Sequence, residues 1–121
     1  MAKIFKLGRT STLALRQRKA ALLCQLAVPP DLLRASYVER FTTCGQPNCA
    51  CVQGQRHGPF YYLTSNLAPG QVLKFLLKDS VQQQRAQLGV RHYQVHWEGL
   101  EELSQINAEL LRRGEPLASQ P

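Results

Sequence analysis

Apolar residues recur at helical spacing near the start of the chain, over residues 11–27. They lie along one face of the predicted helix: Leu13, Ala20, Leu23 and Ala27. Ser11 or Thr12 can cap the helix, because a hydroxyl accepts a hydrogen bond from a free amide of the first turn. The Pro29-Pro30 pair ends it, since proline has no backbone N–H to donate.

The pattern then changes to short runs rich in aromatic and β-branched residues, which predict strands. These runs are residues 36–43, 60–65 and 72–77. The last two are joined by a loop with Pro69-Gly70, a pair suited to a type II turn, so they are expected to form a hairpin. The sequence therefore predicts a three-stranded antiparallel sheet over residues 36–77.

Helical spacing returns after the sheet. Asp79 can cap a helix from Ser80 to about Leu88, and Gly89 predicts a break or kink. Residues 90–113 then continue as a long helix, which Gly114 ends. An apolar stripe along this helix is typical of a core-facing surface, and its members are Tyr93, Trp97, Leu100, Leu103, Ile106 and Leu110.

These elements predict an α+β fold. It consists of an N-terminal helix, a three-stranded antiparallel sheet with a Cys-rich loop, and a long C-terminal helix. We expect a basic N-terminal arm at residues 1–10 and a flexible tail at 114–121. Between them, residues 11–113 are predicted to form a single domain, with the sheet at 36–77 and the C-terminal helical segment at 79–113.

Charge is distributed unevenly along the 121 residues, whose formal net charge is +7. Residues 1–30 hold six basic side chains and no acidic one, whereas residues 98–121 hold five Glu and two Arg. A basic front suggests an anionic partner, most often DNA or RNA; the alternative is a charge excess that only keeps the protein soluble. The candidate phosphate contacts are Arg16, Arg18 and Lys19 on the first helix and Arg40, Arg56 and Lys74 around the sheet.

The second predicted strand carries aromatic residues on both faces of the sheet. Tyr61 and Leu63 point one way, while Phe60, Tyr62 and Thr64 point the other, because side chains alternate along a strand. One face must cover the core, and the other is free to stack nucleic-acid bases. Tyr61 is the candidate stacking residue. The alternative is that the two helices bury both faces.

The Cys-rich loop, residues 44–59, carries the densest concentration of potential metal ligands; the other candidate is the pair His92 and His96, at i and i+4 on the long helix. Cys44, Cys49, Cys51 and His57 together offer the thiolate and imidazole donors that tetrahedral Zn²⁺ prefers. Bound zinc would also compensate for a small core, since its binding energy becomes folding energy. The alternatives are reduced thiols packed in a turn, a disulfide, or an iron–sulfur cluster, for which Cys24 is the remaining thiol. Cys24 lies within the first helix and is expected to be buried.

No pattern typical of a hydrolase, a transferase or a phosphate-binding loop occurs, so the sequence predicts a protein that is not an enzyme. No apolar run approaches the length that crosses a bilayer, which predicts a cytoplasmic protein without membrane contact. A second class of function stays open. The helix at 90–113 is able to pair with a partner protein or with a second copy as a homo-oligomer.

Three motifs together resemble a small bacterial family of unknown function. They are Tyr37-Val38-Glu39-Arg40, the run C-G-x-P-N-C-x-C from Cys44 to Cys51, and H-G-P-F-Y-Y-L from His57 to Leu63. The tail from Leu103 to Leu111 is similar to the C-terminal helix of that family. The resemblance implies a bacterial cytoplasm, a DNA or RNA partner and a setting near mobile genetic elements. Phe60 departs from the pattern, which has Tyr there.

Overall fold

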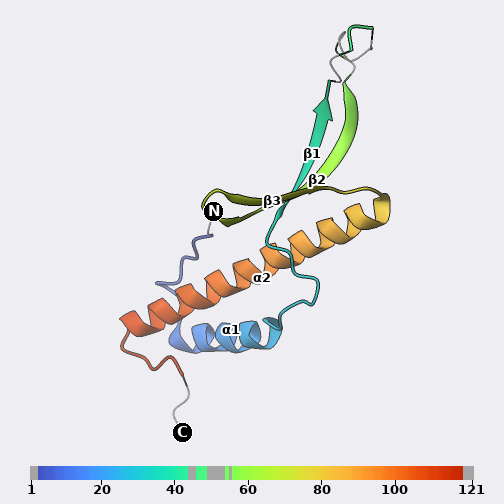
Figure 1. Ribbon diagram of the computed structural model, residues 1–121. Helices are drawn as coiled ribbons and strands as arrows, with labels where there is room; N and C mark the ends of the chain where they lie inside the picture. The colour runs from blue at the N-terminus through green and yellow to red at the C-terminus, as the bar shows by residue number, and fades with distance from the viewer. Residues whose placement is uncertain (1–2, 44–45, 49–53, 55, 119–121) are drawn as a thin grey trace. The chain divides into compact units, whose positions relative to one another are not determined.

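The computed structural model describes residues 3–43, 46–48, 54 and 56–118. Its elements, in chain order, are α1 (Thr12–Gln25), β1 (Ser36–Thr42), β2 (His57–Ala68), β3 (Gln71–Leu76) and α2 (Ser80–Arg112) (Figure 1). The predicted α+β fold, with an N-terminal helix, a three-stranded antiparallel sheet and a long C-terminal helix, is confirmed. None of the helices in the described part of the chain combines the length and apolar character that crossing a membrane demands.

The chain divides into two compact units. One unit joins the two ends of the chain, Met1–Pro30 and Tyr93–Pro121, and is called the terminal unit below. The other, Asp31–His92, contains all three strands and is called the sheet unit. Helix α2 contributes its first turns to the sheet unit and the remainder to the terminal unit. The prediction of a single domain over residues 11–113 stays a prediction.

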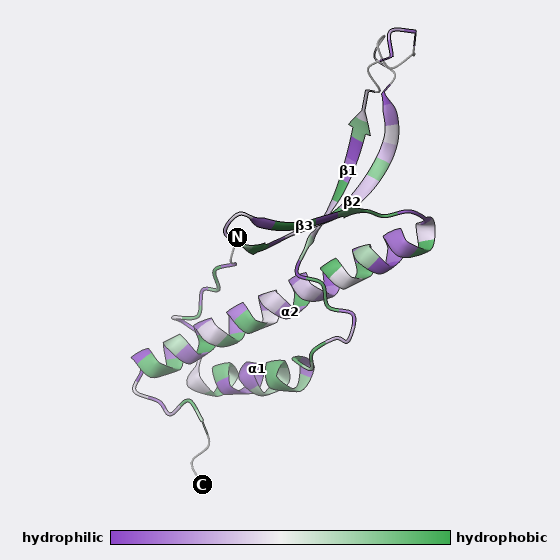
Figure 2. Ribbon diagram, viewed as in Figure 1, coloured by the Kyte–Doolittle hydropathy of each residue, from purple (hydrophilic) through white to green (hydrophobic). Residues whose placement is uncertain are grey.

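The core of the terminal unit lies between α1 and the last turns of α2. Its fully buried members are Leu15, Leu22, Ile106 and Leu110, with Leu7, Leu26 and Leu103 packed around them. The apolar face predicted for α1 was therefore wrong: Leu13 and Leu23 are exposed, and the buried leucines lie on a neighbouring face. Both faces of α1 carry hydrophobic residues (Figure 2), so periodicity alone does not identify the one that packs.

The stripe predicted along α2 is core only at its C-terminal end. Ile106 and Leu110 are buried, as expected, whereas Trp97 and Leu100 are each 42% exposed. The expected end of the helix is confirmed. The Glu115 amide donates to the Leu110 carbonyl over 2.9 Å, with Gly114 in the left-handed region at φ +77°, a geometry that satisfies the last free carbonyls.

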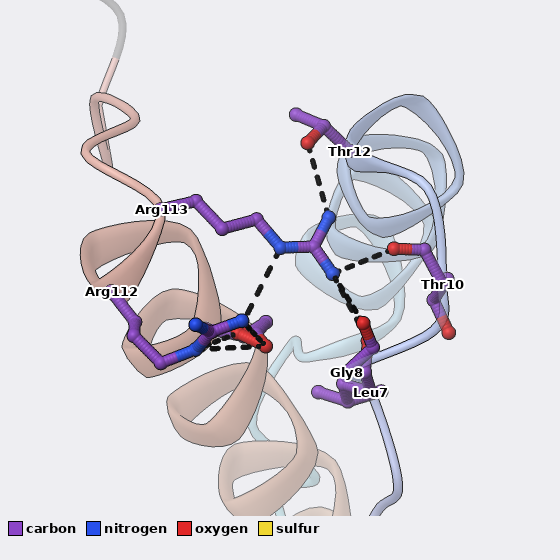
Figure 3. Close-up of polar contacts among 7 residues, drawn as sticks. Leu7, Gly8, Thr10, Thr12, Arg112 and Arg113 are labelled. Carbon is purple, nitrogen blue, oxygen red and sulfur yellow. Dashed lines mark hydrogen bonds and ion pairs between the residues drawn. The ribbon is translucent and has the colours of Figure 1, made fainter.

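Hydrogen bonds from Arg113 connect the N-terminal segment to the end of α2 (Figure 3). Its guanidinium donates to the carbonyl oxygens of Leu7 (3.2 Å), Gly8 (3.4 Å) and Thr10 (2.7 Å), and to the Thr12 hydroxyl over 3.1 Å. The planar group has five N–H donors, which allows it to satisfy several acceptors at once. Part of the segment predicted as a basic arm is thus hydrogen-bonded within the terminal unit.

The sheet has the order β1-β2-β3, with both pairs antiparallel. β2 begins at His57, three residues earlier than predicted, and so runs through Pro59. Proline is tolerated there because β3 pairs only from Tyr62 onward, which leaves β2 with a single neighbour at Pro59. The turn at Pro69-Gly70 is confirmed, and Gly70 has the positive φ of +76° that a type II turn requires.

The predicted break at Gly89 is wrong, because α2 is continuous from Ser80 to Arg112. The glycine serves tertiary packing instead: the Asp31–Leu33 segment lies directly against it, and the Leu33 amide donates to the Gly89 carbonyl over 3.0 Å. On the same helix, His92 places its Nδ1 atom 2.7 Å from Oδ1 of Asp31, which belongs to the segment before β1. The predicted cap is confirmed, since the Gln82 amide donates to Asp79 Oδ1 over 2.8 Å.

Candidate nucleic-acid interface

One face of the sheet is covered in part, although Leu73 and Phe75 on it are exposed, and the other face is open. Leu63 is buried with Leu77, Ala86 and Val90, so the first turns of α2 cover the face on which Leu63 lies. Residues paired directly across strands share a face. The register therefore shows which residues lie on the face opposite Leu63, which is called the open face below. This open face consists of Ser36, Val38 and Arg40 from β1, Phe60, Tyr62, Thr64 and Asn66 from β2, and Val72, Lys74 and Leu76 from β3.

Apolar and aromatic side chains form the centre of the open face. Tyr62 lies in one row between Val38 and Leu76, and Phe60 occupies the next position of β2 on the same side. Phe60 is 37% exposed and Leu76 is 41% exposed, while Tyr62 and Val38 are half-buried. Hydrophobic and hydrophilic residues follow one another along β1 and β2 (Figure 2). The open face thus presents aromatic surface to solvent.

Cations flank these aromatic rings. The Lys74 Nζ lies over the ring of Tyr62, 5.1 Å from its centroid, and Arg40 is paired with Phe60 on the neighbouring strand. The residues assigned to this face include no carboxylate. Glu39, the acid of β1, is paired with Tyr61 and so belongs to the covered face. The open face therefore has the charge and the ring surfaces that an anionic, aromatic ligand requires.

Tyr61, the predicted stacking residue, lies on the covered face. Its ring stacks on that of Tyr37 with centroids 5.2 Å apart, and both rings pack against the buried cluster around Leu63. Burial raises the pKa of the Tyr37 hydroxyl above its ordinary value. Phe60 and Tyr62 are the aromatic residues of the other face, where Phe60 is exposed and Tyr62 is half-buried.

The predicted phosphate contacts on α1 are engaged within the terminal unit. Arg18 makes a bidentate pair with Glu102, both distances being 2.7 Å, and Arg16 pairs with Glu115 over 3.2 Å. Lys19 donates to the Leu117 carbonyl. The hydrogen bond from Arg18 lowers the pKa of Glu102 below its ordinary 4.5, so this carboxylate stays ionised at neutral pH. The acidic C-terminal residues thus offset the basic helix.

Three of the four predicted zinc ligands, Cys44, Cys49 and Cys51, lie outside the described residues. The fourth, His57, is the first residue of β2 and is paired with Thr42 at the end of β1, so the two ends of the Cys loop lie side by side. Arg56 comes directly before β2 and is exposed. No metal-binding cluster occurs among the residues that the structure describes.

Glycine is required next to His57 for two reasons. Gly58 has φ +128°, a backbone conformation that other residues rarely adopt. A Cβ at this position would also lie 2.9 Å from the carbonyl oxygen of Arg40. The glycine of the His-Gly-Pro sequence therefore has a structural cause at the base of the loop, independent of any metal.

Residues 12–86 match the model of a family described as a domain of unknown function, DUF6788, and this match spans more than half of the chain. The chain belongs to the DUF6788 family. This match confirms the expected membership of an uncharacterised family. No curated protein and no solved structure matched the chain.

The DUF6788 match includes α1, the whole sheet and the beginning of α2, and hence every residue of the open face. It excludes Trp97 and the C-terminal end of α2. Sequence reasoning placed Phe60 and Tyr62 together on one face but assigned the stacking role to Tyr61. The only sequence signal that separates the two faces is Leu63, whose aliphatic side chain favours the buried side with Tyr61.

Proposed function

We propose that this DUF6788 protein is a small nucleic-acid-binding accessory protein that presents the open sheet face to its ligand. In this proposal it binds without catalysing a reaction, and it acts in a bacterial cytoplasm in connection with a mobile genetic element. The cytoplasmic and mobile-element parts rest on the motif resemblance alone. The binding part rests on the geometry of the sheet unit.

The observation that carries the proposal is the position of Lys74 over the half-buried ring of Tyr62, with Arg40 beside Phe60 on the same face. A solvent-exposed cation–π contact contributes about 0.5–1 kcal/mol. Stacking of a nucleic-acid base on an aromatic ring contributes about 1–3 kcal/mol. A base can therefore displace the Lys74 ammonium from the ring, and the released cation is then available to a phosphate nearby.

The charge distribution favours the sheet unit over α1 as the interface. Residues 31–92 hold seven basic and three acidic side chains, for a formal charge of +4. The basic residues of α1 have ionic or hydrogen-bonding partners in the C-terminal residues. An incoming phosphate would compete with those partners at α1, whereas none of the residues on the open face is a carboxylate.

We expect the protein to retard an oligonucleotide in an electrophoretic shift assay at low salt, with an affinity that falls steeply as salt rises. The physical reason is that each phosphate neutralised by a cation releases condensed counterions. Replacing Lys74 with glutamine should weaken binding and reduce the slope of log affinity against log salt by about 0.7 to 0.9, the share of one phosphate.

Lys19→Gln is the matched control, because it removes an equal charge from a residue that donates to the Leu117 carbonyl. Its salt slope should equal that of the unmodified protein. If no retardation occurs even at low salt, the proposal is wrong. If Lys19→Gln weakens binding and Lys74→Gln does not, the interface lies on α1 and the open face is not used.

Zinc in the Cys loop is a second part of the proposal, supported by the ligand types and by the adjacency of the loop ends at Thr42 and His57. Elemental analysis of protein purified without chelator should find about one zinc per chain, and Cys49→Ser should lower this content. Cys24→Ser is the control: Cys24 is exposed on α1, contrary to expectation, and its loss should leave zinc unchanged. Less than about a tenth of an equivalent in the unmodified protein would exclude a resident metal.

A different class of function is favoured by one observation in the terminal unit. Trp97 and Leu100, three residues apart on α2, are exposed, and an apolar groove of about 880 Å³ lies along Ala20, Leu23 and Leu103. Aromatic residues are enriched at protein interfaces. In this second proposal α2 docks a partner protein or a second copy. Salt-tolerant association with a mass above that of one chain would support it over nucleic-acid binding.

A further inference from the structure

We propose that the open sheet face selects single-stranded nucleic acid and holds two of its bases on the rings of Phe60 and Tyr62. This inference rests on the proposed function and specifies its ligand. Phe60 is exposed and Tyr62 is half-buried, and the two occupy positions i and i+2 of one strand, so both project from the same side of β2.

The spacing of the two rings argues against an intact duplex. Successive side chains on one face of a strand are about 6.8 Å apart, since each residue advances the strand by about 3.4 Å. Stacked bases in a duplex are about 3.4 Å apart along each strand. Two bases can each lie on one of these rings only if they have separated from one another. A single strand does this at low cost, whereas a duplex would have to unstack.

The surroundings of Tyr62 also suit a base face. Val38 and Leu76 lie on either side of Tyr62 in the same cross-strand row, which makes the floor under a stacked base apolar across all three strands. A duplex exposes base edges in its grooves and keeps base faces hidden by stacking. An apolar surface with an aromatic centre can therefore contact the base faces of a single strand, whereas an intact double helix does not expose them.

The cations occupy positions that follow a strand laid along β2. Arg40 is in the row of Phe60 on the β1 side, and Lys74 is in the row of Thr64 on the β3 side. These rows are four residues apart on β2, about 14 Å, and the row of Tyr62 lies midway between them. A backbone that crosses the face with its bases on the two rings passes both cations. The ring surfaces fix the bases, and the cations neutralise the phosphates.

The decisive experiment compares oligonucleotides of about 12 nucleotides as single-stranded DNA, single-stranded RNA and duplex DNA, by fluorescence anisotropy at one salt concentration. We expect either single strand to bind about tenfold or more tightly than the duplex. The relative affinity of the DNA and RNA strands identifies which of the two is the source of the ligand.

Tyr62→Ala should weaken single-strand binding about tenfold and leave its salt slope unchanged, because the ring stacks and carries no charge. Tyr62→Phe keeps the ring and should bind within about twofold of the unmodified protein. Phe75→Ala is the matched control, since it removes an exposed aromatic ring from the opposite face of the same sheet, and it should leave single-strand binding unchanged. Phe60→Ala gives an independent test if Tyr62→Ala does not fold, and should also weaken single-strand binding.

The outcomes separate this inference from the proposed function. If none of the three oligonucleotides binds, both are wrong. If duplex binds as tightly as single strand, or if the Tyr62 and Phe60 variants bind normally, nucleic-acid binding stands and the stacking inference is wrong. The candidate duplex-binding element would then be the β1–β2 ribbon, since a two-stranded ribbon fits the major groove.

Discussion

Replacing Gly89 with alanine should destabilise the sheet unit by about 2–3 kcal/mol, although the same change in a free helix would stabilise it. The added Cβ would lie 2.5 Å from the Asp31 carbonyl oxygen and 2.7 Å from Leu33 Cδ1. Backbone cannot rotate away as a side chain can, and the Leu33 amide is hydrogen-bonded to the Gly89 carbonyl. The whole Asp31–Leu33 segment would have to shift. Urea unfolding followed by circular dichroism measures the loss.

Gly99→Ala is the matched control, because it makes the same change in the same helix. The nearest atom to its new Cβ is Leu26 Cδ2 at 2.7 Å, the far end of a flexible side chain. That atom can move aside, so we expect a change between neutral and about 1 kcal/mol of added stability from helix propensity. Equal effects of the two substitutions would contradict the close packing of the Asp31–Leu33 segment on α2.

The wrong prediction of a break at Gly89 shows a limit of prediction from local sequence. A glycine within a helical pattern signals either a break or a close approach of another chain segment, and local propensity does not separate the two. The elements that depend on neighbouring residues were predictable: the caps at Ser11 and Asp79, the turn at Gly70 and the end at Gly114. What decided Gly89 is a segment more than fifty residues earlier in the chain.

The candidate site, like the fold, was predictable where it depends on local sequence and unpredictable where it depends on tertiary contacts. Alternation along β2 gave the two sets of side chains, but period two yields two faces and does not say which one α2 covers. Burial of Leu63 with Ala86 and Val90 made that choice, and it is the reason why the proposed stacking residue is Tyr62 and not Tyr61. Likewise, the excess of positive charge at the front was visible in the sequence, whereas its pairing with Glu102 and Glu115 depends on tertiary contact.

The terminal unit should be more sensitive to truncation of a core side chain than its number of leucines suggests. Its buried cluster has four members, so little remains to compensate for a lost one. Exposed leucines are plentiful in the same unit, at positions 13, 23, 100 and 111. The effect of a substitution should therefore follow burial and not residue type.

Leu110→Ala should cost about 2–5 kcal/mol, because the substitution removes buried methyl groups and leaves a cavity between α1 and α2. Leu111→Ala makes the identical change one residue later and should alter stability by no more than about 0.5 kcal/mol. Leu110 is 0% exposed and Leu111 is 65% exposed, so the pair differs chiefly in burial. Trp97, the single tryptophan, lies in the same unit, and its fluorescence follows unfolding there. Since small domains retain only about 5–15 kcal/mol, a loss of this size would remove a substantial share of the stability of the unit. Equal midpoints for the two variants would mean that α1 does not pack on this face of α2.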